Sequence, residues 1–302
     1  MNLLDDKLES LITVCEEKNF TKAGIKLGLT QPAVSNHMKK LEEELGITLF
    51  LQKKGDLELT IEGQIVLLYA KRMKALLEKM NQKIIDAKNN LQNLRIGITQ
   101  TQESGLMLEV LSKMAIEDDK LSITIITDTI KNLYDKLDNF EIDLAIIEGK
   151  PSNHSFNYIM LDTDYLSCIA SPEHKFKNKS IITLNDLKKE HLILRLPDSS
   201  TRQLFESTLE SINDSIKNFD VTVEVDNIST IKSLIQKNIG VTILATNTCQ
   251  KEIKKGKLIS LPIENLNMIR ETNLVYHKNF QYNDILNTII KLYNEANKKL
   301  NW

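Results

Sequence analysis

The sequence predicts an all-α domain with a β wing, then one long helix, then a two-lobed α/β domain. Three observations support this fold class. Two short amphipathic segments near the N-terminus flank a tight turn that contains glycine, which is typical of a helix-turn-helix. The next segment keeps a single helical repeat from Thr60 to about Leu91. Beyond residue 92, short β-rich runs alternate with helical ones, as in parallel βαβ units.

Length and composition limit the class of protein. The chain has 302 residues, which exceeds a typical single domain of about 100–150 residues. It has no run of about 18 apolar residues and no secretory signal, so we expect no membrane association and a cytoplasmic location. The three cysteines lie far apart and no histidine pair has a metal-ligand spacing. We therefore expect no disulfide, no metal site and no cofactor.

The first two predicted helices are short. The first has an apolar stripe that begins at Leu4 and ends at Cys15. The second has Thr21 as its candidate N-cap and ends at Gly28, a residue that suits a helix C-terminus. A third helix follows after a turn of only a few residues, which completes the predicted helix-turn-helix.

The third helix is the predicted DNA-reading element. Thr30 is its candidate N-cap, Pro32 lies in its first turn and Gly46 ends it. One face is apolar, with Val34, Met38, Leu41 and Leu45. The other face carries small or amide-bearing side chains suited to base edges and phosphates, with Gln31, Ala33, Ser35, Asn36, His37 and Lys40. An ordinary amphipathic helix with a solvated face remains the alternative.

A β-hairpin wing is predicted next. Ile47–Phe50 and Leu57–Leu59 are short extended runs around a basic turn, where Lys53 and Lys54 could contact phosphate. The net charge of the whole chain is −2, but the segment between residues 20 and 54 contains six lysines and only three glutamates. DNA binding must therefore depend on the placement of charge, or on doubling it by dimerisation.

The long helix predicts a homodimer. Its apolar stripe repeats at intervals of three and four residues over roughly 45 Å, at Ile65, Tyr69, Met73, Leu76, Met80, Ile84, Ala87 and Leu91. A domain of about sixty residues cannot bury such a stripe, and a second copy of the helix is the simplest partner. Packing of the helix on its own C-terminal domain remains the alternative.

The C-terminal part predicts two α/β lobes, because βαβ patterns occur in two separate runs. The predicted strands of these runs are Leu94–Ile98, Ser122–Thr127, Asp143–Ile147, His191–Arg195, Val221–Val225 and Val241–Leu244. Further strands are expected at Asn157–Leu161, Tyr165–Ala170 and Glu271–His277, and a last helix from Gln281. The predicted parts of the chain are the winged helix-turn-helix at residues 1–60, the long linker helix at 61–91 and the two-lobed α/β domain at 92–302. Lobe I comprises about 92–162 and 267–302, and lobe II about 163–266.

Three clusters of hydroxyl and amide side chains predict a ligand site. They lie at residues 99–104, 198–202 and 226–230, each beside a predicted strand end or helix start. Ligands of open α/β sheets bind beyond the carboxyl ends of strands, and helix N-termini favour anions. The predicted effector-binding residues are Thr99, Gln100, Thr101, Gln102, Ser199, Ser200, Thr201, Ser229 and Thr230. Plain helix capping by Ser and Thr remains the alternative.

The motifs resemble those of LysR-type transcriptional regulators. The resemblance rests on an ordered set of motifs that covers about forty residues. They are FTKA at 20–23, TQPAVS at 30–35, LE at 41–42, LG at 45–46, LF at 49–50 and LT at 59–60. Further phrases extend the resemblance over essentially the whole chain, with EIDLAII at 141–147, LILR at 192–195, DSSTR at 198–202 and KNIGVTIL at 237–244.

The resemblance implies a winged helix-turn-helix, a dimerising linker helix and a two-lobed effector domain like periplasmic binding proteins. It also implies a homodimer or homotetramer on pseudo-palindromic double-stranded DNA, controlled by a small-molecule effector. The predicted DNA-binding residues are then Gln31, Pro32, Ser35, Asn36, His37, Lys39, Lys40, Lys53 and Lys54. The run Thr99–Gln102 resembles the sulfate-responsive cysteine-biosynthesis branch, so a small anion or carboxylate-bearing metabolite is the expected effector.

The sequence disfavours two other classes of function. An enzyme is disfavoured because the sequence has no nucleophile elbow, P-loop or G-x-G-x-x-G motif. An architectural DNA-binding protein without an effector is disfavoured by the net charge of −2 and by the large α/β part.

Overall fold

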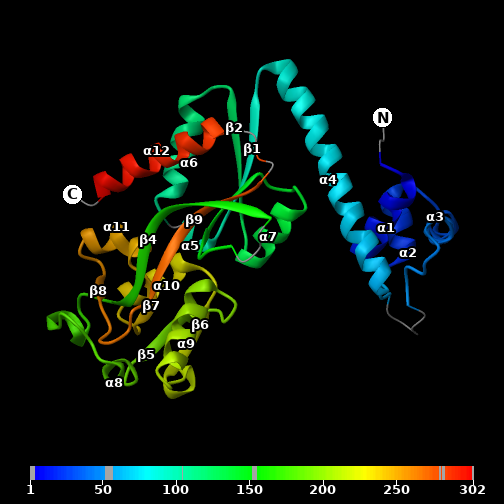
Figure 1. Ribbon diagram of the computed structural model, residues 1–302. Helices are drawn as coiled ribbons and strands as arrows, with labels where there is room; N and C mark the ends of the chain where they lie inside the picture. Colours follow the sequence, from blue (N-terminus) through cyan, green and yellow to red (C-terminus); the bar gives the residue numbers. More distant parts are fainter. Residues whose placement is uncertain are drawn as a thin grey trace. The chain divides into compact units, whose positions relative to one another are not determined.

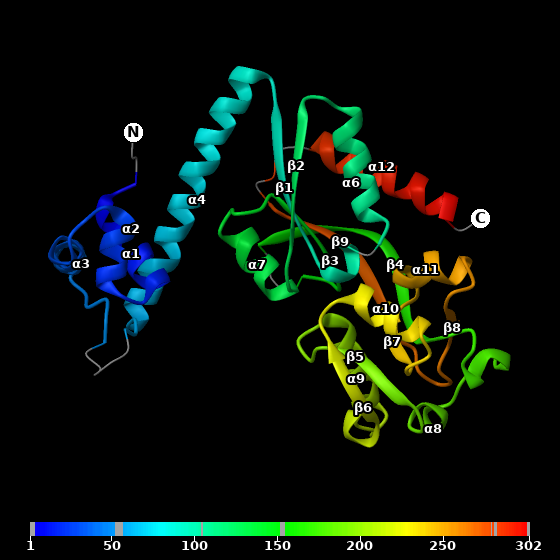
Figure 2. The ribbon, with the colours of Figure 1, turned by 180° about the vertical axis from the view of Figure 1, so that it is seen from behind.

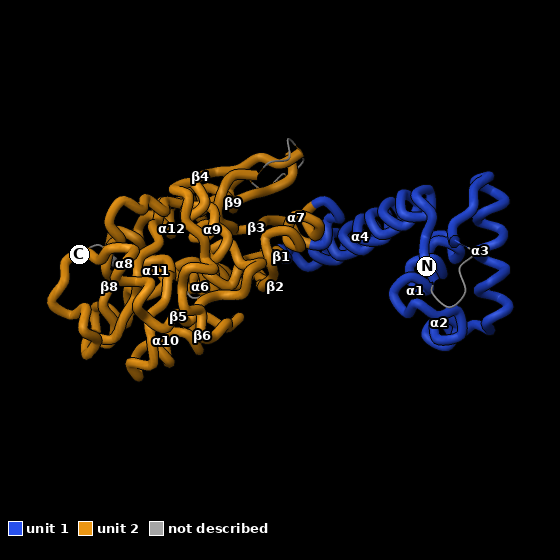
Figure 3. The backbone as a smooth tube through the Cα atoms, turned by 90° about the horizontal axis from the view of Figure 1, so that it is seen from below, with its two compact units in different colours: residues 1–93, 138–141 blue, residues 94–137, 142–302 orange. Residues whose placement is uncertain are grey.

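The computed structural model describes residues 4–51, 57–103, 105–151, 155–278, 280 and 283–300. The chain forms two compact units, which Figure 3 shows in different colours. The first comprises residues 1–93 and 138–141, and the second comprises residues 94–137 and 142–302. Each unit has buried apolar clusters of its own.

The first unit begins with three short helices. They are α1 (Asp6–Glu17), α2 (Phe20–Leu27) and α3 (Gln31–Leu45). Leu11, Met38 and Leu41 are buried together between them, which agrees with the predicted apolar faces. The prediction is wrong for Leu45, which is 48% exposed in the last turn of α3. The prediction of Thr21 as the N-cap of the second helix is wrong. Asn19 caps α2 instead, because its side chain accepts a hydrogen bond from the amide of Lys22.

The predicted wing is present as a single antiparallel bridge between Phe50 and Leu59. The amide of Leu51 also donates to the carbonyl of Glu58 at 2.8 Å. Residues 52–56, which include Lys53 and Lys54, lie outside the described part of the chain. The described residues therefore confirm the pairing at the base of the wing, and the predicted contacts of its tip stay a prediction.

Helix α4 (Ile61–Asn89) follows, with Thr60 as its N-cap. Only Gly63, Ala70 and Asp86 are buried within it. Its large apolar side chains remain exposed in the single chain, namely Ile65, Leu68, Tyr69, Met73, Leu76, Met80, Ile84 and Ile85. Most of the predicted stripe is therefore not covered by the chain's own described residues.

The second unit is an α/β domain of two lobes (Figures 1 and 2). Lobe I contains β1 (Gln92–Ile98), β2 (Leu121–Thr127) and β3 (Leu144–Glu148), with α5 (Gln100–Glu103), α6 (Met107–Glu117), α7 (Ile130–Asp138) and α12 (Asn283–Leu300). All five residues of β3 are buried. Leu144 and Ile146 pack toward α6 and α12, whereas Ala145 and Ile147 pack toward α7. Helices therefore cover both faces of the sheet, as expected for parallel strands.

Lobe II is also built of strands and helices, and two of its strands, β7 and β8, pair with β4. Its strands are β5 (His191–Arg195), β6 (Asp220–Val225), β7 (Thr242–Ala245) and β8 (Ile259–Leu261). Its helices are η1 (Lys175–Asn178), α8 (Leu184–Leu187), α9 (Ser200–Ser211), η2 (Ile216–Asn218), α10 (Ile228–Gln236) and α11 (Thr246–Lys254). Along β5, Leu192 and Leu194 pack with Phe205 of α9, whereas Ile193 packs with Ile231 of α10.

Two antiparallel strands connect the lobes. They are β4 (Phe156–Ala170) and β9 (Ile269–His277), which pair from Phe156 to Tyr165. We predicted two strands here, but β4 is one strand of 15 residues. The polar residues Asp162–Asp164 lie between the two predicted strands, yet they pair with β9 beyond a register shift that follows Met160. The other predicted strands of this unit occur with small differences at their ends.

Candidate DNA-binding helix and effector cleft

Helix α3 presents the predicted DNA-reading face outward. Thr30 caps the helix, because its side chain accepts from the amide of Ala33, and Pro32 lies in the first turn. The buried residues of α3 are Val34, Met38 and Leu41. The exposed or half-buried residues include all seven predicted DNA-binding positions of this helix: Gln31, Pro32, Ser35, Asn36, His37, Lys39 and Lys40.

Two hydrogen bonds orient side chains on this face. The Gln31 amide donates to the Ser35 hydroxyl at 2.9 Å, so these two polar groups lie one helical turn apart on the same side. The Nδ1 atom of His37 lies 2.8 Å from the Ser10 hydroxyl of α1. His37 is therefore fixed to the domain interior, whereas Gln31 remains exposed at the start of the helix.

The second candidate site is a cleft of ≈ 840 Å³ in the α/β unit. Residues from the carboxyl ends of four strands line it, and β1, β2, β5 and β6 supply them. The lining residues used below are Thr99, Gln100, Thr101, Asp128, Thr129, Lys131, Tyr134, Arg195, Asp198, Ser199, Ser200, Gln203 and Asp226. A cleft at strand ends is the expected location for a ligand in this type of sheet.

Glu148 is the buried carboxylate beside this cleft. It is the last residue of β3. One oxygen accepts from the Thr99 hydroxyl at 2.8 Å and from the Gln102 amide at 3.1 Å, and the other accepts from the Ser200 hydroxyl at 3.3 Å. All three donors are neutral. Because Ser200 belongs to lobe II, its hydrogen bond joins the two lobes.

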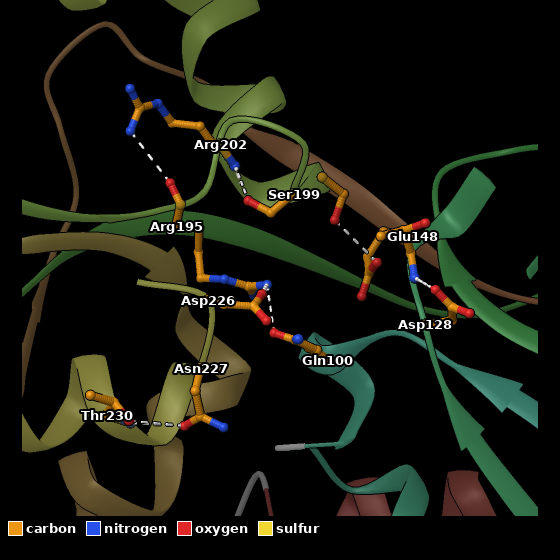
Figure 4. A network of polar contacts seen from close by, with 11 residues as sticks. Gln100, Asp128, Glu148, Arg195, Ser199, Arg202, Asp226, Asn227 and Thr230 are labelled. Carbon is orange, nitrogen blue, oxygen red and sulfur yellow. Dashed lines mark hydrogen bonds and ion pairs between the residues drawn. The ribbon is translucent and has the colours of Figure 1, made fainter. Parts of the chain in front are cut away.

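Arg195 is the buried cation of the cleft and the last residue of β5. Only 5% of it is exposed. Its Nη2 atom donates to the Gln100 side-chain oxygen at 2.7 Å and lies 3.5 Å from a carboxylate oxygen of Asp226 (Figure 4). Burial lowers the pKa of the guanidinium, and the carboxylates of Asp226 and Glu148 act in the opposite direction.

The N-terminal part of α7 and the residues before it also line the cleft. Asp128 accepts from the Asn132 amide at 2.7 Å and pairs with Lys136 at 3.2 Å. Burial alone would raise the pKa of Asp128, but the hydrogen bonds from Asn132, Thr129 and Lys136 outweigh it and lower the pKa. Burial also raises the pKa of Tyr134 to about 12, so this phenol is neutral at ordinary pH.

The structure brings five of the nine predicted effector-binding residues to the cleft, namely Thr99, Gln100, Thr101, Ser199 and Ser200. Gln102 and Thr201 are buried beside it: Gln102 bonds Thr272 as well as Glu148, and Thr201 accepts from Arg270. Ser229 and Thr230 do not line the cleft. They are exposed in the first turn of α10, where Asn227 accepts from the Thr230 amide.

Capping accounts for part of the predicted clusters. Ser199 caps α9 through the amide of Arg202, and Asn227 caps α10. The predicted ligand site lacks Arg195, Glu148 and Asp128, and Asp226 belongs to the predicted cluster at 226–230 without being one of the predicted effector-binding residues. Their common signal is position, because each is the last residue of a strand or the first residue after one.

Within the described ranges, no group of three or more His, Cys, Asp or Glu residues could hold a metal ion. None of the described helices is long and apolar enough to cross a membrane.

Two family models match the chain. "Bacterial regulatory helix-turn-helix protein, lysR family" matches residues 6–64, and "LysR substrate binding domain" matches residues 88–297. The second match alone covers more than half of the chain. The chain therefore belongs to the LysR family. It is a DNA-binding transcriptional regulator with an effector-binding domain, which confirms the predicted class.

Relatives and solved structures agree with this assignment. A probable RuBisCO transcriptional regulator of Phaeodactylum tricornutum is 29% identical over 297 residues, covering 96% of this chain and 97% of the relative. The full-length CbnR structure in complex with its target DNA has a TM-score of 0.68 at 16% identity, covering 96% of this chain and 99% of CbnR. The Synechocystis CcmR regulatory domain in complex with 2-PG has a TM-score of 0.59 at 20% identity, covering 67% of this chain and 97% of that domain. At these identities, the two structures establish the fold alone.

Proposed function

We propose that this regulator binds a pseudo-palindromic DNA site as a homodimer or homotetramer, through α3 and the wing, and that an oxyanion-bearing small molecule in the strand-end cleft controls it. The observation that carries the proposal is the exposure of the predicted reading face of α3 while its apolar face is buried. The N-terminal turns of such a helix are the part that enters a major groove. The cytoplasm is the compartment in which such a protein would act.

The apolar stripe of α4 supports the proposed dimer. Tyr69, Met73 and Met80 are each at least 40% exposed in the single chain. A repeated stripe of this kind on one long helix suits pairing with a second copy of the same helix. Two copies would also double the local positive charge around α3, which the net charge of −2 makes necessary.

The cleft supports an acidic effector. Arg195 and the first turn of α9 both favour negative charge there, because free amides at a helix N-terminus attract anions. The solved CcmR domain carries 2-PG, and CbnR is solved with its target DNA. The relative reported above is named as a RuBisCO regulator and not as a sulfate-responsive one. The proposal therefore keeps the oxyanion and leaves out the sulfate-responsive branch.

The experiment begins with selection of a DNA duplex by the full-length chain from a random pool, followed by footprinting of the duplex. We expect two half-sites related by a pseudo-two-fold axis. Gln31→Ala should then lose about 1–3 kcal/mol of specific binding, because a base contact of that size disappears. Binding is measured by fluorescence anisotropy at fixed salt.

Gln64→Ala is the matched control. Gln64 is also exposed in the first unit but lies on α4, outside the reading helix. Its replacement should leave affinity for the selected duplex unchanged. Equal binding by Gln31→Ala and the wild type would reject the assignment of α3, and a footprint over a single half-site would reject the dimer.

A further inference from the structure

We propose that Arg195 receives the acid group of the effector, and that this group replaces Gln100 on the guanidinium. The proposal deepens the proposed function and rests on it, because it concerns the same cleft. It names the residue that selects the effector and the protein contact that the effector displaces.

The hydrogen bonding of Arg195 is the first argument. The Nε and Nη2 atoms of an arginine lie on the same edge of the planar group and form a two-pronged donor. Nη2 donates to the Gln100 oxygen at 2.7 Å. Nε is buried and has no hydrogen-bond partner among the described residues. One amide oxygen therefore satisfies half of an edge that a carboxylate or phosphate would satisfy with two parallel hydrogen bonds.

Charge is the second argument. The carboxylate of Asp226 lies 3.5 Å from Nη2, and its side chain is 62% exposed, so water screens this ion pair. Gln100 contributes a neutral oxygen. Glu148 is occupied by three neutral donors and forms no ion pair with any described residue. The buried guanidinium of Arg195 thus forms no direct ion pair with a buried carboxylate, because the charge of Glu148 acts on it only from beyond ion-pair distance. An oxyanion would supply such a direct pair.

Arg195 suits an oxyanion better than the other cation of the cleft. Lys131 also lines it, but Lys131 is exposed on α7 and its ammonium is a point charge. Only the guanidinium offers two donors in one plane. The effector class that follows is a small metabolite that ends in a carboxylate or phosphate.

The Gln100 contact also connects the lobes. Gln100 begins α5 in lobe I, and Arg195 ends β5 in lobe II, so their hydrogen bond spans the cleft (Figure 4). An effector oxygen in place of the Gln100 oxygen would change a direct bond between the lobes into one that passes through the effector. Effector binding and the contact between the lobes would then be linked through a single guanidinium.

The test measures anion affinity by isothermal titration calorimetry of the full-length chain with inorganic phosphate, sulfate and acetate, and with acetamide as the uncharged match for acetate. Gln100→Ala should bind phosphate at least fivefold more tightly than the wild type, because no amide oxygen competes for Nη2. Asp226→Asn should also bind more tightly, because a nearby negative charge is lost. Arg195→Lys should bind at least tenfold more weakly, and acetamide should bind no variant.

Gln203→Ala is the matched control for Gln100→Ala. Gln203 lines the same cleft, and among the described residues its side chain forms no hydrogen bond with Arg195. The two predicted gains of affinity cannot arise from misfolding, so they decide the case even if Arg195→Lys fails to fold. The proposal is overturned if Gln100→Ala matches Gln203→Ala, if Arg195→Lys binds phosphate as the wild type does, or if no chain binds any of the three anions.

The comparison of carboxylate with phosphate and sulfate separates the possible sources of the acid group. Tighter binding of acetate than of phosphate by the wild type would assign a carboxylate, and tighter binding of phosphate than of acetate would assign a phosphate. Affinity of the wild type for its selected duplex, measured without added anion, separates the two proposals. Loss of that binding would defeat the proposed function, whereas intact DNA binding with anion affinity indifferent to Arg195 would defeat only this inference.

Discussion

The face of α3 and the strand-end cleft are built in opposite ways. The α3 positions lie within ten consecutive residues and are largely exposed. The cleft gathers residues that are far apart in sequence: Gln100 and Arg195 are separated by 95 residues, and Thr99 and Glu148 by 49. Several of its polar groups are buried and already hydrogen-bonded to one another.

The difference shows that the two sites would recognise their partners in different ways. A surface helix offers its side chains to a partner at little cost, so its chemistry is visible in a periodic sequence. A buried polar cluster must satisfy its own donors and acceptors first. A ligand there acts by exchanging partners, as proposed for Gln100 on Arg195, and not by simple addition.

The largest expected effect comes from Phe205→Ala, which should damage the cleft without damaging α3. Phe205 is buried in lobe II. Its ring packs edge to face against that of Phe219, with 5.8 Å between the two ring centroids. Removing the ring should cost about 3–5 kcal/mol of stability and loosen α9, whose first turn lines the cleft. Differential scanning calorimetry should show a lower melting temperature for the α/β unit only.

Leu11→Ala is the reciprocal control, because Leu11 is buried in the core of the first unit. It should lower the other transition and leave that of the α/β unit in place. Equal shifts of a single transition in both variants would mean that the two units unfold together, and the contrast drawn above would lose its energetic basis.

A smaller effect is expected from Thr30→Ala, which tests how local the α3 site is. The Thr30 side chain accepts from the Ala33 amide at 3.3 Å, so its loss should cost about 0.5–2 kcal/mol. The first turn, which holds Gln31, should fray and DNA affinity should fall. Urea unfolding and anisotropy measure the two effects.

Thr21→Ala provides the comparison for this change. Thr21 is exposed in α2, and the cap of that helix is Asn19. Replacement of Thr21 should leave both stability and DNA binding close to those of the wild type. Similar losses in the two variants would show that the cap of α3 has no special role.

The smallest effect concerns His174, which belongs neither to α3 nor to the lining of the cleft. Burial lowers the pKa of His174, and Glu190 at 3.3 Å opposes this shift. The folded protein therefore takes up this proton less readily than the unfolded chain, whose ordinary value is 6.5. Stability should fall as pH decreases below about 6.5 and through the lowered pKa.

Urea unfolding between pH 5.5 and 7.5 measures that slope. His174→Gln should flatten it within this window. An equally steep decline in the variant would assign the acid sensitivity to another group.

The order and type of the main elements could be predicted because their signals are local. Caps such as Thr30, glycines such as Gly46 and alternating apolar runs act within a few residues. The continuity of β4 could not be predicted, because Asp162–Asp164 is polar and its strand conformation depends on pairing with β9, a distant segment. The local sequence pattern carries no information about such long-range pairing.

The same limit applies to the cleft. The strand ends at Thr99 and Ser199 could be predicted, because hydroxyl residues there stand out after apolar runs. The partners Arg195 and Glu148 could not, because each terminates an apolar strand and its role depends on contacts across the fold. Ser229 and Thr230 have the same residue types as the lining positions, yet they lie away from the cleft.

The 15-residue strand β4 runs without interruption from lobe I into lobe II, paired with β9 for most of that distance. Because this one ladder joins the lobes, a change of angle between them must bend β4 and β9 themselves. The register shift between Met160 and Asp162 is where the ladder is already irregular. We expect a hinge motion of the lobes to be absorbed at this point.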